Sequence, residues 1–497
     1  MMGIHQPQAE LFNYRVNLEQ RVRKDHPLRR VAEAIDFTFV RAEVAQFYGH
    51  NGNEGIDPVI LVKLMFLLFF DDVPSERELM ERLPERLDYL WFLGYSLDEA
   101  TPHHSVLSKA RCRWGQPVFQ GIFLRTIQQC VEAGLVDGTK IHVDSSLIDA
   151  NASKDSVKKS CPELIAAYKN VVSAQETKLA ETTTPENYLA VNDTHVCMSD
   201  PDAALVSRRG QSSRARYHHH RAIDDVHGVI TAVETTTGSI AENHKLRDLI
   251  EQHEKNTQKE VRTVVGDSKY GTADNFAACV EKNIAPHLGV LADQQRSQTE
   301  REAHYEDAQF NYDAASDTYT CPAGQKLRRR RYHERRSTYE YTTATGVCAA
   351  CALRGKCTNA KTTGRTLQRH KQAASVALGR QIARSPRARR DRRRRQHLME
   401  GSFAQAANQH GFKRSRWRRL WRQQIQDWLI ATVQNIKILL KTSLRRASGA
   451  AANPVLKALN PMIQRVDCLF PLPEGQGIIM WPFAFLRHLI GISPVCS

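Results

Sequence analysis

Three acidic residues have the chemistry needed to share a metal ion. Asp144 lies in the run 139–146, where apolar and polar residues alternate as in a strand with one buried face. Asp267 ends the apolar run 261–267, and Glu400 lies in a segment with helical spacing. Adjacent strands of one sheet can bring the two aspartates together, and a helix packed on that sheet can add the glutamate. Composition alone is equally compatible with three surface acids among the 54 Asp and Glu residues.

The chemistry that such a set of carboxylates supports is phosphoryl transfer. Three hard oxygen donors suit Mg²⁺ or Mn²⁺. Two such ions, about 3.5–4 Å apart, activate an attacking oxygen and stabilise a leaving oxygen. A nucleophilic side chain is then not needed.

The elements that must position these acids follow a mixed pattern of strands and helices. After the strand that carries Asp144, two strands are predicted over 217–223 and 229–235, joined by a turn. The order then continues with a helix over 240–253, a strand over 261–267, a helix over 273–282 and a strand over 284–291. This order predicts an α/β fold built on a mixed sheet.

The first part of the chain, residues 11 to about 114, is predicted to be helical. Pro58 stands in the first turn of a strongly apolar helix, and Ser75 begins a capping box. A last short helix presents a polar and basic side, which resembles a helix-turn-helix DNA reader. An ordinary helical bundle with a solvated basic face is the alternative. The predicted DNA contacts on this helix are His104, Ser105, Ser108, Lys109 and Arg111.

The chain of 497 residues is basic, with 70 Lys and Arg against 54 Asp and Glu and a formal charge of +16. This excess favours a polyanionic partner, nucleic acid first, over a solvated surface without one. The densest basic run is Arg384–Arg395, from which Arg392, Arg394 and Arg395 are predicted to contact DNA phosphates. A solvated linker is the alternative for this run.

The sequence gives no sign of a membrane or secretory segment. Residues Met1–Phe12 lack an apolar core, and the run Ile60–Phe70 is interrupted by Lys63 and too short to span a bilayer. We therefore expect no membrane partner and a cytoplasmic protein with reduced or metal-bound cysteines.

Four of the 11 cysteines are grouped at spacings typical of a zinc site. Cys348 and Cys351 form a C-x2-C pair, Cys357 follows, and Cys321 lies upstream in a Cys-Pro-Ala-Gly turn. Four thiolates suit tetrahedral Zn²⁺, so a structural zinc is predicted here. Reduced cysteines without a metal are the alternative.

The sequence resembles the DDE transposases of bacterial insertion sequences through many short motifs in family order. These are Tyr14–Glu19, Asp25–Arg29, Ile56–Pro58, Ser75–Arg77, Pro102–Ser108, Val143–Ser146, Asp200–Asp202, Gly266–Gly271, Glu400–Ala404, His410–Gly411 and Asn435–Lys437. The resemblance implies an RNase H-like catalytic domain with Asp144, Asp267 and Glu400 as its acidic triad, holding Mg²⁺ or Mn²⁺. Water attack would cut the element's ends, and the freed 3′-hydroxyl would attack target DNA. The implied partners are double-stranded DNA, both the terminal inverted repeats and the target, and further copies of the chain. The implied location is the bacterial cytoplasm, near the nucleoid.

The pattern and the resemblance together divide the chain into five parts. The predicted parts are a helical DNA-binding domain over 1–135, the first part of the catalytic core over 136–293, a cysteine-containing insertion over 294–384, catalytic helices with Glu400 over 385–446, and an unassigned tail over 447–497.

The surroundings of Glu400 depart from the resemblance. Such transposases place Tyr, Arg and Lys on the helix face around this glutamate, where this chain has Arg393, Gln396 and Ala407. A neutral amide and a methyl group cannot contact a phosphate as cations do. Two alternatives therefore stand beside a transposase: a catalytically impaired relative that binds the ends, and a metal-dependent DNA nuclease.

Overall fold

The computed structural model describes residues 16–49, 55–175, 191–208, 211–290, 305–358 and 363–442. The chain divides into two compact units, Met1–Leu440 and Lys441–Ser497. The predicted tail 447–497 lies outside the described residues. All elements below belong to the first unit, apart from the last residues of its final helix.

The N-terminal part is helical, as predicted. Its α-helices are α1 (Leu18–Arg21), α2 (Pro27–Ala34), α3 (Phe39–Val44), α4 (Pro58–Phe70), α5 (Glu76–Arg82), α6 (Leu87–Leu93) and α7 (Ser105–Glu132). Ser75 caps α5 as predicted, because it accepts a hydrogen bond from Glu78 N, and Asp57 caps α4 by accepting one from Val59 N. The last short helix predicted in this part continues as far as Glu132 in one element, kinked at Gly115, where φ is 66°.

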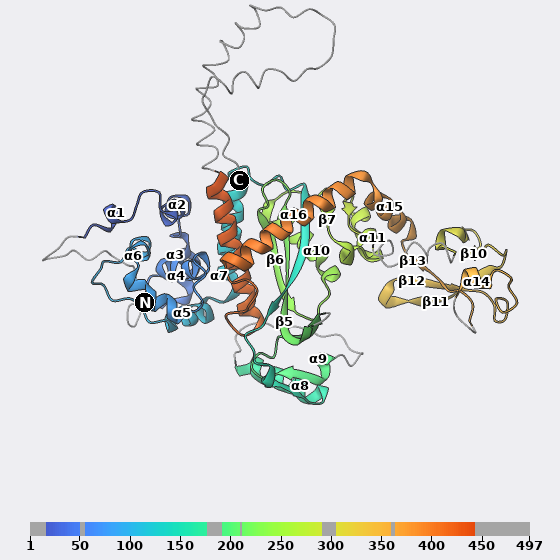
Figure 1. Cartoon of the computed structure of the whole chain (residues 1–497), viewed down its shortest axis with the longest axis horizontal. Coiled ribbons are helices and arrows are strands. Elements are labelled where there is room, and N and C mark those ends of the chain that lie inside the picture. The colour runs from blue at the N-terminus through green and yellow to red at the C-terminus, as the bar shows by residue number, and fades with distance from the viewer. Residues whose placement is uncertain are drawn as a thin grey trace, which may run out of the picture. The chain divides into compact units, whose positions relative to one another are not determined.

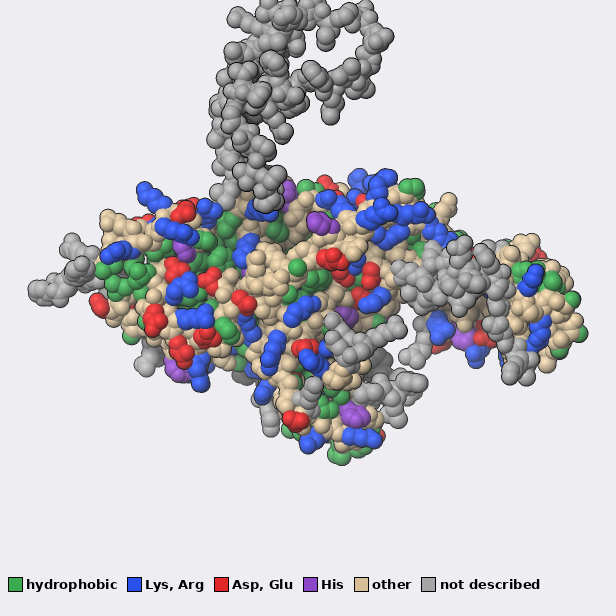
Figure 2. Space-filling view, viewed as in Figure 1, with side chains coloured by type: hydrophobic (Ala, Val, Ile, Leu, Met, Phe, Trp, Pro, Cys, Tyr) green, Lys and Arg blue, Asp and Glu red, His purple; other side chains and the backbone are tan. Residues whose placement is uncertain are grey.

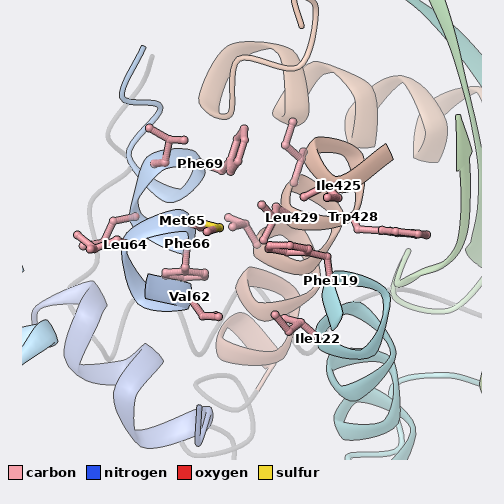
Figure 3. Packing of buried hydrophobic residues seen from close by; sticks show 14 of the residues in the cluster. Val62, Leu64, Met65, Phe66, Phe69, Phe119, Ile122, Ile425, Trp428 and Leu429 are labelled. Atoms are coloured by element: carbon pink, nitrogen blue, oxygen red, sulfur yellow. The ribbon is translucent and has the colours of Figure 1, made fainter. Parts of the chain in front are cut away.

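The core of these helices is shared with the end of the chain. Apolar residues of α4 and α7 pack against the helix over 420–442, which contributes Ile425, Trp428 and Leu429 (Figure 3). This helix begins where Asp200 accepts a hydrogen bond from Arg419 N and Asp202 accepts one from Leu420 N. Burial of Ile and Leu side chains stabilises this contact by roughly 1.5–3 kcal/mol each.

A mixed sheet forms the centre of the unit, as predicted. Its order is β4-β5-β1-β7-β8, with β6 also paired to β5. The strands are β1 (Lys140–Asp149), β4 (Ala204–Arg208), β5 (Gln211–Asp224), β6 (Ile230–Thr237), β7 (Thr263–Val265) and β8 (Ala285–His287). β1 runs antiparallel to β5 and parallel to β7. The helices α10 (Leu246–Thr257) and α11 (Ala273–Glu281) follow β6 and β7 in the predicted order.

Two smaller sheets complete the β structure. β2 (Val157–Lys159) pairs with β3 (His195–Cys197), near α8 (Pro162–Gln175) and α9 (Val191–Thr194). The cysteine-containing segment forms a five-stranded sheet in the order β13-β12-β11-β10-β9. Its elements are β9 (Asn311–Asp313), β10 (Thr318–Thr320), β11 (Lys326–His333), β12 (Thr338–Thr342), α14 (Arg354–Cys357) and β13 (Leu367–His370).

The basic run 384–395 is helical, so the alternative of a solvated linker is wrong. α15 (Ala373–Arg384) ends at Ser385, whose hydroxyl accepts a hydrogen bond from Ala388 N and caps α16 (Pro386–Gln409). Figure 1 shows α16 running across the central sheet, and α16 contacts β1, β7 and β8. The helix that carries Glu400 therefore packs on the strand that carries Asp144.

Acid should destabilise the folded chain through three buried histidines. Burial lowers the pKa of His219, His253 and His410 to about 4, from an ordinary value of about 6.5. Between these pKa values the unfolded chain binds protons that the folded chain does not. The contribution of these histidines to the free energy of unfolding is therefore fully present above about pH 6.5 and decreases as the pH is lowered towards about 4. Asp200 acts in the opposite direction, because burial raises its pKa to about 6, and burial also raises the pKa of Asp144 and Asp224. Burial lowers the pKa of further histidines, His142, His220 and His287, so the buried histidines outnumber these carboxyls.

We expect the thermal midpoint to fall between pH 7.5 and pH 5, measured by circular dichroism. His253→Gln should lower the midpoint at pH 7.5 but make it less sensitive to pH. An equal pH dependence in wild type and variant would contradict the assignment.

Candidate active site

Parallel pairing of β1 and β7 brings two of the predicted acids to one edge of the sheet. Asp144 lies on β1, and Asp267 follows directly after β7, where its carboxylate caps the short turn Ser268–Tyr270. The turn is packed tightly: a Cβ at Gly289 would lie 2.7 Å from the backbone of Ser268. Glycine at this position therefore lets the Asp267 turn sit against the sheet.

Glu242 is the third acid of this group. Carboxylate oxygens of Asp144, Glu242 and Asp267 all lie within 4.8 Å of one another. Glu242 is buried in the turn after β6, and it accepts hydrogen bonds from Ser145 Oγ at 2.5 Å and Lys269 Nζ at 2.7 Å. Sequence reasoning missed Glu242, because its place beside Asp144 depends on how β5 and β6 fold back on β1 and on no local motif.

The electrostatics of the group favour a bound cation. Burial raises the pKa of Asp144, the neighbouring Asp267 and Glu242 raise it further, and Arg395 opposes the shift. The hydroxyl of Tyr270 is buried near these acids and has no hydrogen-bond partner among the described residues. Three crowded carboxylates and a spare hydroxyl fit the oxygen-rich surroundings that Mg²⁺ and Mn²⁺ prefer.

Arg395 joins α16 to this group. Its Nη2 lies 2.9 Å from Asp144 Oδ1, and its Nε donates to Val143 O at 3.0 Å. The side chain is buried, so the prediction that Arg395 lies on a DNA-facing surface is not supported. Arg392 and Arg394 also bond to the protein: Arg392 donates to two backbone carbonyls, and Arg394 donates to Asp225.

Glu400 lies on the exposed side of α16, five residues after Arg395. Its Oε1 accepts a hydrogen bond from Gln396 Nε2 at 3.1 Å. Glu400 is not part of the acidic group within 4.8 Å. The exposed side of the same helix carries a row of arginines, and Figure 2 shows Lys and Arg side chains gathered over α15 and α16. The exposed arginines of α16 include Arg387, Arg389, Arg390 and Arg393.

The predicted DNA contacts on α7 divide into exposed and buried residues. Ser108 and Lys109 are exposed, while His104 and Ser105 are partly buried. Arg111 is only 2% exposed, forms an ion pair with Glu76 and lies 3.8 Å from the ring centroid of Trp417. The prediction that Arg111 faces DNA is therefore not supported, because packing of α7 on the C-terminal helix region covers it.

The four predicted zinc ligands line one cavity of the small sheet domain. Cys321 Sγ accepts a hydrogen bond from Gln325 N at 3.3 Å, and Cys348 Sγ lies 3.1 Å from Thr343 Oγ1. Burial raises the pKa of Cys357, and the nearby Cys321, Cys348 and Cys351 contribute to this shift. Among the described residues, no three of these sulfurs lie within 4.8 Å of one another.

Comparison with known proteins identifies two family models along the chain. A transposase domain (DUF772) matches residues 16–113, and a transposase DDE domain matches residues 320–440. No curated protein matches the sequence. Among the described residues, no helix combines the length and hydropathy that crossing a membrane requires.

Solved structures that resemble the chain do so weakly. A piggyBac transposase synaptic complex with hairpin DNA has a TM-score of 0.34 and 9% identity, with 94% of this chain and 82% of that chain covered. A Mos1 transposase paired-end complex has a TM-score of 0.16 and 11% identity, with 54% and 70% covered. The family models rather than these structures carry the comparison: the chain contains a match to a transposase domain followed by a match to a transposase DDE domain, in the order of the sequence motifs.

Proposed function

We propose that the chain is a DNA transposase that cuts the ends of its element and joins them to target DNA. The observation that carries the proposal is the group of three carboxylates, from Asp144, Glu242 and Asp267, at one edge of the sheet. Divalent ions bound there would activate the attacking oxygen and stabilise the leaving oxygen of phosphoryl transfer. We propose Asp144 and Asp267 as ligands, Glu242 as a further ligand and Glu400 as the acid supplied by α16.

The protein's own cations would hold the DNA around this group. Exposed arginines along α16 lead towards Glu400, and each phosphate contact contributes affinity that falls with salt. Lys269 is 69% exposed beside Glu242, where it can meet a phosphate next to the reacting one. Arg395, one residue before Gln396, is buried and paired with Asp144, so it would act on that carboxylate rather than on the DNA.

The wider assembly is also proposed on this basis. We propose domain boundaries at 135, 293, 384 and 446, an RNase H-like core, a homo-oligomer that pairs two ends, and a location near the bacterial nucleoid. Each of these is consistent with a transposase. The mixed sheet with β5, β1 and β6 antiparallel and β7, β8 parallel supports the proposed core.

A strand-joining assay tests the proposed function. The full chain is incubated with Mg²⁺ and DNA that carries the element's own ends, and the products are separated on a sequencing gel. Joined products support the transposase. Cleavage without joining would indicate a nuclease, and a mobility shift without cleavage would indicate an impaired end-binding relative.

Two single variants test the roles proposed for the glutamates. Glu400→Gln is expected to lower cleavage by about a hundredfold, because it removes the charge facing the reacting DNA. Glu242→Gln is expected to weaken Mn²⁺ binding by about tenfold, measured by calorimetry, because it removes one ligand. Glu281→Gln, an exposed position on α11, is the matched control and should leave both unchanged. Wild-type cleavage by Glu400→Gln would refute its catalytic role.

We also propose a structural zinc in the small sheet domain, held by Cys321, Cys348, Cys351 and Cys357. The shared cavity supports it, and Gly364 allows the approach, since a Cβ there would lie 2.8 Å from Cys348 Sγ.

Purified protein is expected to contain one zinc ion per chain by mass spectrometry of its metals. Cys351→Ser should lose the metal and destabilise the small domain by about 2 kcal/mol or more, seen as a lower thermal midpoint. Cys112→Ser, at an exposed cysteine outside the cavity, should retain both. Zinc-free wild-type protein of unchanged stability would disprove the site.

A further inference from the structure

We infer that the small sheet domain carries a binding face for an unpaired DNA segment, formed by the arginines of β11 and the exposed ring of Tyr332. This inference rests on the proposed function for the identity of the nucleic acid. It adds a second DNA surface, distinct from α16 and from the acidic group.

The charge of the small domain is the first observation. Residues 305–371 contain 13 Lys and Arg against six Asp and Glu. On β11, six of eight residues are exposed, among them the four consecutive arginines Arg328–Arg331. The buried residue of this strand is Leu327, which belongs to the small apolar core, so the four arginines are not needed to build that core.

Acidic neighbours balance only part of this charge. Arg329 Nη1 lies 3.3 Å from Asp317, and Arg331 Nε lies 3.2 Å from Glu340. Arg330 is 3.9 Å from the same Glu340, which also bonds to His333. Three of the four arginines thus share two carboxylates, and the remaining positive charge suits a phosphate backbone.

Aromatic side chains next to these arginines are the second observation. Tyr332 is 42% exposed, and its ring centroid lies 4.9 Å from that of its cross-strand partner Tyr339. The guanidinium of Arg329 lies 4.8 Å from the Tyr339 ring centroid. Three planar groups therefore lie side by side, with Tyr332 at the open end.

An exposed ring beside arginines distinguishes unpaired from duplex DNA. Bases in a duplex are stacked on both faces, while an unpaired base has a free face that can stack on tyrosine. Proteins that bind single strands commonly stack the bases on aromatic rings of a sheet, while arginines contact the phosphate backbone of the nucleic acid. The face therefore suits a DNA segment whose bases are unpaired, as at a frayed or melted end.

The small domain is tied to the catalytic sheet at its base. Nε2 of His370, at the end of β13, lies 3.0 Å from Oδ1 of Asp274 in α11. α11 is the helix that follows the Asp267 turn. An unpaired segment held by β11 is thus held by a domain anchored to an element of the active site.

Fluorescence anisotropy of the full chain with a labelled short oligodeoxythymidylate, in buffer without added divalent cations, tests the inference. Tyr332→Ala is expected to weaken single-strand binding about tenfold, or about 1.4 kcal/mol, while duplex affinity stays within about twofold. Tyr332→Phe should bind as wild type, because the ring is kept. Arg328→Gln and Arg330→Gln should each reduce the salt dependence, and Lys356→Gln on α14 is the matched control.

Wild type that does not bind the oligonucleotide, or Tyr332→Ala that binds it as wild type does, would overturn the inference. Equal weakening for single strand and duplex would overturn it too. Leaving out added divalent cations makes this result independent of metal binding by the acidic group. If the protein binds the oligonucleotide through Tyr332 but joins no strands, only the proposed function is refuted. If it joins strands but Tyr332 does not contribute to binding, only the inference is refuted.

Discussion

Replacing Asp144 with asparagine is expected to lower strand cleavage about a thousandfold, which corresponds to about 4 kcal/mol of transition-state stabilisation. The amide keeps the Oδ1 that accepts from Ser145 N and faces Arg395, so local packing should be preserved. It lacks the negative charge that the shared oxygen cluster contributes to a metal ion. The chemical step should therefore fail while binding of DNA continues.

The measurement pairs a cleavage assay with a mobility shift on the same DNA. Asp248→Asn, on the outer side of α10, is the control for loss of one carboxylate, and it should cleave as wild type does. If Asp144→Asn cut DNA at the wild-type rate, the acidic group would not be the active site.

Replacing Arg221 with leucine is expected to cost about 3–5 kcal/mol of the free energy of unfolding. Arg221 is fully buried, its Nε donates to His219 Nε2 at 2.8 Å, and His219 Nδ1 lies 2.9 Å from the buried carboxylate of Asp427. Removing the cation leaves Asp427 buried beside a histidine whose pKa burial lowers to about 4. An uncompensated buried charge is among the largest single destabilising effects.

The same arginine fixes the helix that carries Glu400. Its Nη1 donates to Ser402 Oγ at 2.9 Å and to Gln434 Oε1 at 3.2 Å, and it lies 4.3 Å from the Phe403 ring centroid. We therefore expect Arg221→Leu to lower cleavage as well as stability, because α16 loses the hydrogen bond between Ser402 and Arg221 of β5.

Chemical denaturation followed by circular dichroism measures the loss. Arg214→Leu is the matched control. Arg214 lies on β5, as Arg221 does, and pairs with Asp149 of β1, but it is half exposed, so its loss should cost less than about 1 kcal/mol. Adding Asp427→Asn to Arg221→Leu should recover part of the loss, as the two charges are coupled. Equal costs for Arg221 and Arg214 would show that the buried network does not stabilise the fold.

Local patterns predicted much of the fold. Alternation placed Asp144 on a strand, and Asp57 and Ser75 marked helix starts, because these signals depend only on neighbouring residues. The local sequence of the basic run predicts exposed arginines. The packing of α16 on β1 instead buries Arg395 and pairs it with Asp144. Burial of a charged residue by a distant element leaves no local mark.

The candidate site was predicted in part for the same reason. Asp144 on β1 and Asp267 directly after the parallel strand β7 follow from strand order, whereas Glu242 lies in a turn with no motif of its own. Likewise, the burial of Arg111 depends on Trp417, about three hundred residues away in the chain, and could not be inferred from its helix.

The central claim is that Asp144, Glu242 and Asp267 bind divalent metal for DNA cleavage. Electron paramagnetic resonance of Mn²⁺ titrated into the full chain tests it most directly. Wild type is expected to bind Mn²⁺ and to release it to excess Mg²⁺, while Asp144→Asn and Asp267→Asn each bind at least about tenfold more weakly. Unchanged Mn²⁺ binding in both variants would contradict the account.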